Sequence, residues 1–97
     1  MPTYITLLNW TQQGIQNVKD SPSRLEKAKA ATKAAGGEIK AFYMTMGQYD
    51  MVVVIEAPDD ETYARTVLAI ASHGAVTSQT LRAFTEDEYR KIVGSLP

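Results

Sequence analysis

The feature that most constrains the fold is a pair of strand-like runs joined by four residues. Ile39–Met46 (IKAFYMTM) and Met51–Glu56 (MVVVIE) are rich in apolar, aromatic and β-branched residues, and Gly47–Asp50 (GQYD) separates them. So short a connection joins antiparallel neighbours, because a parallel crossover needs about a dozen residues or more. We therefore expect a β-hairpin near the middle of the chain, with Gly47–Asp50 at its tip.

The segments on both sides of the hairpin alternate between strand and helix patterns. Ser21-Pro22 is a typical helix start, with Ser21 as the cap, and Gly36-Gly37 is a typical stop. Thr85 followed by Glu88 forms a capping-box pattern. The predicted elements besides the hairpin are a strand Tyr4–Trp10, one helical turn in the loop Thr11–Asp20, a helix from Ser21 to Gly36, a helix from Pro58 to Gly74, a strand Ala75–Phe84 and a helix from Thr85 to Gly94.

This order of elements predicts an α+β fold of the ferredoxin-like β-α-β-β-α-β type, as one domain over residues 1–97. Its four-stranded antiparallel sheet carries both long helices on one face, which leaves the other face uncovered. Met51–Ile55 is nevertheless apolar on both faces, whereas a strand with one solvated face alternates apolar and polar residues. We therefore expect a second copy to cover that face in a homodimer or a higher homo-oligomer.

Composition excludes several classes of function. Ten basic and eleven acidic residues give a net charge of −1, with no long run of either sign, so neither nucleic acid nor membrane is an expected partner. The chain has no cysteine, which excludes disulfides, thiolate zinc sites and cysteine nucleophiles. The longest apolar run, Met51–Ile55, is far shorter than the roughly 20 residues of a membrane span, and we expect a cytoplasmic protein.

The hairpin tip has two interpretations, which are compatible. Gly47 can adopt a left-handed conformation and Asp50 can bond nearby backbone N–H groups, so the motif is first of all turn chemistry. Alternatively, Tyr49 and Asp50 stand at the mouth of a cleft, where a phenol and a carboxylate offer hydrogen bonds or proton transfer to a ligand.

Three further side chains are candidates for ligand binding. Tyr43 shares a predicted strand face with Ile39, Ala41 and Thr45, and across a pocket it can meet Arg82. The guanidinium of Arg82 would attract a carboxylate or phosphate there, although an arginine near a strand end more often forms a surface or interface ion pair. Trp10 either stacks on a ligand or seals an interface or the edge of the core.

No metal or cofactor site is expected. His73 is the only histidine and lies at a predicted helix end, where it fits a capping role. No acids cluster with ligand spacing, and phosphate loops and nucleophile motifs are missing.

Several segments resemble the GYD domain family. Besides Gly47–Asp50 followed by Met51–Pro58, they are Thr3–Ile5, Ser21–Arg24, Gly36-Gly37, Phe42–Met46 and Thr80–Phe84, which together span nearly the whole chain. The resemblance implies a ferredoxin-like domain of the dimeric α/β-barrel type, found in small bacterial proteins. It implies no catalytic residues, because the biochemical role of the family is largely unassigned.

Two hypotheses of function follow. The first is a homo-oligomeric binding or interaction module that presents a cleft to a small organic molecule or to a protein partner. The alternative is a cofactor-free monooxygenase or isomerase that uses Tyr43, Tyr49 or Asp50 as acid/base groups or polar anchors.

Overall fold

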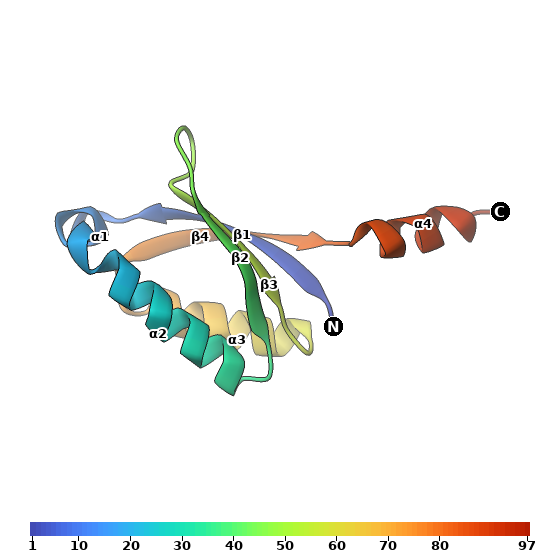
Figure 1. The fold of residues 1–97 in the computed structure, drawn as a ribbon, viewed down its shortest axis with the longest axis horizontal. Helices are drawn as coiled ribbons and strands as arrows, with labels where there is room; N and C mark the ends of the chain where they lie inside the picture. Colours follow the sequence, from blue (N-terminus) through green and yellow to red (C-terminus); the bar gives the residue numbers. More distant parts are fainter.

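An antiparallel sheet in the strand order β2-β3-β1-β4 organises the computed structural model, which describes residues 1–97 (Figure 1). Helices α2 and α3 cover one face of the sheet, and α4 projects away from it. The predicted ferredoxin-like α+β fold is confirmed. The elements are β1 Thr3–Trp10, α1 Gln12–Gln16, the 3-10 helix η1 Val18–Asp20, α2 Ser21–Ala34, β2 Glu38–Met44, β3 Met51–Glu56, α3 Asp60–Ala71, β4 Val76–Ala83 and α4 Glu86–Gly94.

The predicted hairpin of β2 and β3 is confirmed, but one prediction about its faces is wrong. The strands pair antiparallel, with Met44 opposite Met51. A β-bulge at Lys40 shifts the register, so that Ile39 pairs with Ile55 and Ala41 with Val54. An extra residue of this kind reverses the face on which the preceding side chains lie. Ile39 therefore lies on the face covered by the helices, whereas Tyr43 lies on the uncovered face.

The helix ends follow local capping chemistry, with two departures from prediction. Thr85 and Glu88 form the expected capping box. Ser21 does not cap α2; it is the first residue of the helix, because η1 leads directly into α2. The loop Thr11–Asp20 contains two short helices, α1 and η1, where one turn was predicted. Thr11 caps α1 by accepting a hydrogen bond from the backbone N–H of Gly14 at 3.1 Å.

None of the helices has the length and hydrophobicity to span a bilayer.

The core lies between the sheet and α3. The rings of Tyr4 and Tyr63 stack with centroids 4.0 Å apart and planes at 8°. The Tyr63 hydroxyl lies 2.6 Å from the Thr6 hydroxyl and 2.7 Å from that of Thr80, so it connects α3 to two strands. Only 11 of the 97 residues are buried, so this thin interior leaves space elsewhere between sheet and helices. The remaining core residues are Val53, Ile55 and Ala57, with Leu8, Ile39, Phe42 and Val67 packed against them.

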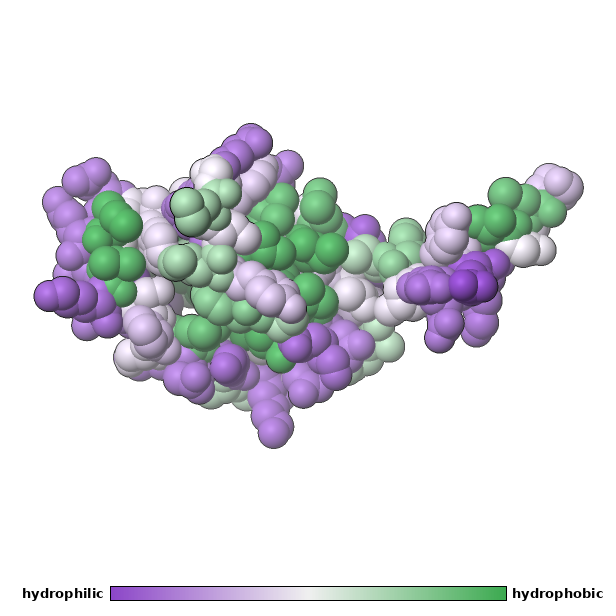
Figure 2. Space-filling model, turned by 45° about the horizontal axis from the view of Figure 1, so that its top comes forward, coloured by the Kyte–Doolittle hydropathy of each residue, from purple (hydrophilic) through white to green (hydrophobic).

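The face opposite the helices is apolar, as expected from the sequence. Strand pairing places Val52 and Val54 there beside Ile5, Leu7 and Leu81. Figure 2 shows hydrophobic side chains gathered over the middle of the molecule on this side. Tyr43 and Leu81 on it are 62% and 45% exposed, so large apolar side chains meet solvent. Its coverage by a second copy stays a prediction.

Candidate functional site

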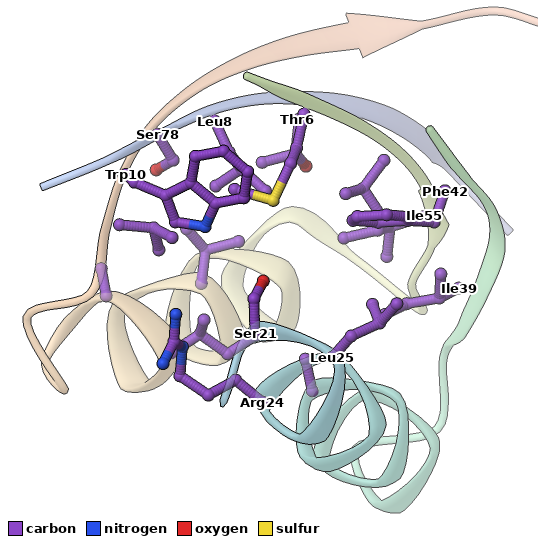
Figure 3. A pocket seen from close by; sticks show the side chains of 17 residues that line it. Thr6, Leu8, Trp10, Ser21, Arg24, Leu25, Ile39, Phe42, Ile55 and Ser78 are labelled. Carbon is purple, nitrogen blue, oxygen red and sulfur yellow. The ribbon is translucent and has the colours of Figure 1, made fainter. Parts of the chain in front are cut away.

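A cavity of about 90 Å³ lies between the sheet and the helices α2 and α3 (Figure 3). Thirteen of its seventeen lining residues are hydrophobic, and no aspartate or glutamate is among them. The sheet contributes Leu8, Phe42 and Met51 to the wall, and the helices contribute Leu25 and Val67. Such a cavity, apolar with a few convergent polar groups, is the usual form of a small-molecule site.

Several polar groups of the cavity lie near the end of β1. The indole nitrogen of Trp10 is buried and has no hydrogen-bond partner within the chain. In Figure 3 it faces into the cavity, on the side where Ser21 and Arg24 extend from α2. Arg24 donates hydrogen bonds to the backbone carbonyls of Asn17 at 3.2 Å and Gly14 at 3.5 Å. These contacts hold its guanidinium beside the cavity.

Asp50 is bonded to the backbone of Trp10 and fixes the position of the end of β1. Its Oδ2 accepts a hydrogen bond from the backbone N–H of Trp10 at 3.0 Å. Its own backbone N–H donates to the carbonyl of Leu8 at 2.9 Å and to Oδ1 of Asn9 at 3.0 Å, and its carbonyl accepts from the N–H of Thr45 at 2.8 Å. Asp50 thus joins the hairpin tip to β1, which supports the interpretation as turn chemistry.

The two candidate tyrosines lie on the other side of the sheet. Tyr43 is on the uncovered face, and the hydroxyl of Tyr49 donates to Oε1 of Gln79, whose strand position is also on that face. Neither tyrosine lines the cavity. Since Asp50 is engaged with the backbone, the three groups named for the enzymatic alternative do not converge on one reaction centre.

Arg82 lies away from both the cavity and the two tyrosines, near the end of β4. Its guanidinium lies over the rings of Tyr4 and Phe84, 5.5 and 4.8 Å from their centroids. It donates to the backbone carbonyls of Thr3, at 3.3 Å, and Ala83. Strand pairing puts Arg82 on the covered face and Tyr43 on the uncovered one, so the pocket in which they were expected to meet does not form.

One titratable pair joins the buried core to the exposed start of α3. The Tyr4 hydroxyl donates to a carboxylate oxygen of Asp60 at the start of α3. Burial, followed by this hydrogen bond, raises the pKa of Tyr4 to about 12. A phenol with so high a pKa stays protonated at neutral pH, so it supports the fold and is a poor proton donor. No group of three or more metal-ligating side chains occurs in residues 1–97.

Sequence reasoning missed the four polar or charged residues that line the cavity beside Trp10, namely Thr6, Ser21, Arg24 and Ser78. A signal was present, because Arg24 precedes Ala28 by one helical turn and so shares its face. That spacing placed Arg24 toward the sheet, but only the folded chain shows that this part of α2 lies opposite Trp10.

Comparison with known proteins identifies the family of this chain. The sequence profile of the GYD domain matches residues 4–93. The chain belongs to the GYD domain family. Its sequence is 37% identical over 84 residues to the glutamine synthetase and cystathionine beta-lyase binding protein of Thermus thermophilus, an alignment that covers 86% of this chain and 88% of that relative.

Solved structures agree on the fold of this GYD domain. A Thermus thermophilus protein of known crystal structure matches with a TM-score of 0.56 at 23% identity, over 88% of this chain and 95% of that one. The feast or famine regulatory protein of M. tuberculosis, in complex with L-methionine, matches with a TM-score of 0.64 at 16% identity, over 90% of this chain and 54% of that one.

Proposed function

We propose that this GYD domain is a homo-oligomeric protein-binding module whose partner is a metabolic enzyme, glutamine synthetase or cystathionine β-lyase. The observation that carries the proposal is the 37% identity, over 86% of the chain, to a protein named for binding these two enzymes. The separation of Tyr43, Tyr49 and Asp50 favours binding over catalysis as well.

The uncovered sheet face is the surface we assign to self-association. Its apolar side chains come from all four strands of the sheet, and a contiguous exposed apolar surface of this kind marks an interaction site in a soluble protein. Two copies packed sheet to sheet would bury Val52, Val54 and Leu81 and so explain why β3 is apolar on both faces.

A second surface for contact with another chain is α4. Its exposed apolar residues recur at helical spacing along one side, and it forms no hydrogen bond or ion pair with residues before Thr85. Figure 1 shows it extending from the end of β4, away from the sheet. An amphipathic helix presented in this way is a common means of filling a groove on a partner. The apolar residues of the helix are Tyr89, Ile92 and Val93, and the exposed Leu96 follows its end.

Self-association is tested by light scattering and sedimentation velocity at micromolar concentration. We expect the wild type to have the mass of a dimer or a larger oligomer, and Leu81→Glu to shift it toward the monomer, because the substitution places a charge in the interface. Leu68→Glu is the matched control, since Leu68 is 70% exposed on α3 and outside the sheet face. A monomeric wild type, or equal behaviour of the two variants, contradicts this assignment.

Enzyme binding is tested by biolayer interferometry with purified glutamine synthetase and cystathionine β-lyase from the source organism. We expect saturable binding of at least one of the two, and weaker binding when Ile92 on α4 is replaced by glutamate. Glu86→Gln on the polar side of α4 serves as the control. If neither enzyme binds, the proposed partner is wrong; if Ile92→Glu binds like the wild type, the role of α4 is wrong.

A further inference from the structure

The cavity beside Trp10 contains a buried hydrogen-bond donor that the chain does not satisfy. An indole N–H can only donate, and its nitrogen is inaccessible to solvent without an acceptor among the protein atoms. Most buried polar groups have partners, because an unpaired one costs about 1–3 kcal/mol. The orientation of Trp10 in Figure 3, with this nitrogen toward the cavity, therefore favours a bound molecule that offers an acceptor.

The same region carries positive charge that no acid balances. Arg24 lines both this cavity and a hollow of about 290 Å³ between α2 and α3, which Lys27 and His73 also line. Neither space is lined by an aspartate or a glutamate. Arg24 forms no ion pair, and its hydrogen bonds go only to backbone carbonyls. A guanidinium of this kind pairs well with a planar carboxylate.

The volume of the cavity and the chemistry of its wall determine what the remaining part of the ligand can be. The cavity of about 90 Å³ is smaller than the roughly 150 Å³ of an engineered apolar cavity that binds benzene, so it suits a short alkyl group. Leu8, Phe42 and Val67 provide apolar contact for such a group. An ammonium group would find no acid there, and an unpaired buried charge is strongly unfavourable.

We propose that this cavity binds a small aliphatic carboxylate. The alkyl chain packs between the sheet and the helices, and the carboxylate accepts hydrogen bonds from the Trp10 indole and from Arg24. Free amino acids of the same size are excluded by their ammonium group. The site is separate from the uncovered sheet face and from α4, so it does not depend on the proposed protein binding.

The test uses 4-methylpentanoate and leucine, which share a carbon skeleton and differ by the amino group. Trp10 is the only tryptophan, so the full-length protein labelled with ¹⁵N gives a single indole N–H resonance. We expect 4-methylpentanoate to shift this resonance saturably at millimolar concentration or below, and leucine to bind at least tenfold more weakly. An indole resonance that does not move, or equal binding of leucine, overturns the proposal.

Two variants test the assigned contacts. Arg24→Gln should weaken binding of 4-methylpentanoate at least tenfold, the effect of losing one charge-assisted hydrogen bond. Arg65→Gln is the matched control, because Arg65 pairs with Glu61 on the surface of α3 and lines neither space. Unchanged binding by Arg24→Gln overturns the proposal.

Trp10→Phe tests the carboxylate site independently, including the case in which Arg24→Gln does not fold. It keeps an aromatic ring at the position and removes a donor that makes no bond within the chain, so the variant should remain folded. Its affinity, followed by methyl resonances of the lining leucines, should fall several-fold. Wild-type affinity in this variant shows that the indole does not hold the carboxylate and overturns the proposal.

Discussion

Replacing Tyr63 by phenylalanine tests whether one hydroxyl group stabilises the contact between α3 and the sheet. The hydroxyl oxygen lies 2.6 Å from Oγ1 of Thr6 on β1 and 2.7 Å from Oγ1 of Thr80 on β4. Phenylalanine keeps the ring that stacks on Tyr4 and leaves no cavity. The loss is therefore confined to two hydrogen bonds.

The expected magnitude follows from the surroundings of the two threonines. Thr6 is only 3% exposed, so its hydroxyl is left without a partner, which costs about 1–3 kcal/mol. Thr80 is exposed and regains a hydrogen bond with water, so its loss is smaller. We expect Tyr63→Phe to lower the free energy of unfolding by roughly 1.5–3 kcal/mol, with Tm falling by about 4–8 °C per kcal/mol in a chain of this size.

The assay is urea unfolding followed by far-UV circular dichroism, at fixed protein concentration because self-association would shift the midpoint. A double-mutant cycle with Thr6→Val adds a second measurement. In the double variant both partners are apolar, so we expect the two losses to be non-additive by at least about 1 kcal/mol. Tyr89→Phe is the control, since that hydroxyl is exposed and makes no hydrogen bond within the chain. A change below about 0.5 kcal/mol for Tyr63→Phe, or an additive cycle, refutes the reasoning.

Three further predictions concern the core, the hairpin tip and a loop. The pKa of Tyr4 is about 12 in the folded chain, against 10.0 in the unfolded chain. The stability that this shift contributes is fully present below pH 10 and is lost as the pH rises from 10 to 12. Tyr4→Phe should flatten the pH dependence of unfolding in that window, as measured by urea titrations at successive pH values. Asp50→Ala removes the acceptor for the Trp10 backbone N–H, so we expect a loss of about 1–3 kcal/mol and a shifted tryptophan fluorescence maximum; an unchanged spectrum contradicts this. In Gly14→Ala the new Cβ would lie 1.9 Å from a backbone carbonyl oxygen, so thermal unfolding should show that the free energy of unfolding falls by about 2 kcal/mol or more. Gly94→Ala is the control: its Cβ would lie in open space, so this variant should be neutral or stabilising.

The sequence determined the features that depend on neighbours along the chain. The hairpin followed from two β-rich runs and a four-residue connection, because short loops join antiparallel strands. The capping box of Thr85 and Glu88 followed from their spacing, since both partners lie within one helical turn. The apolar character of both faces of Met51–Ile55 followed from the alternation of side chains along a strand. The family followed from motifs that are spread along the chain.

The tertiary structure alone decided the make-up of the candidate site. The bulge at Lys40 reverses the face of Ile39, and the alternation of residues in the sequence does not reveal it. Trp10, Arg24 and Asp50 are far apart in the sequence, and they come together because β1 lies between β3 and β4 while α2 crosses back over the sheet. Periodicity assigns a side chain to a face of its own element. Which residues of different elements meet depends on strand register and helix placement, and these are set by packing across the whole domain.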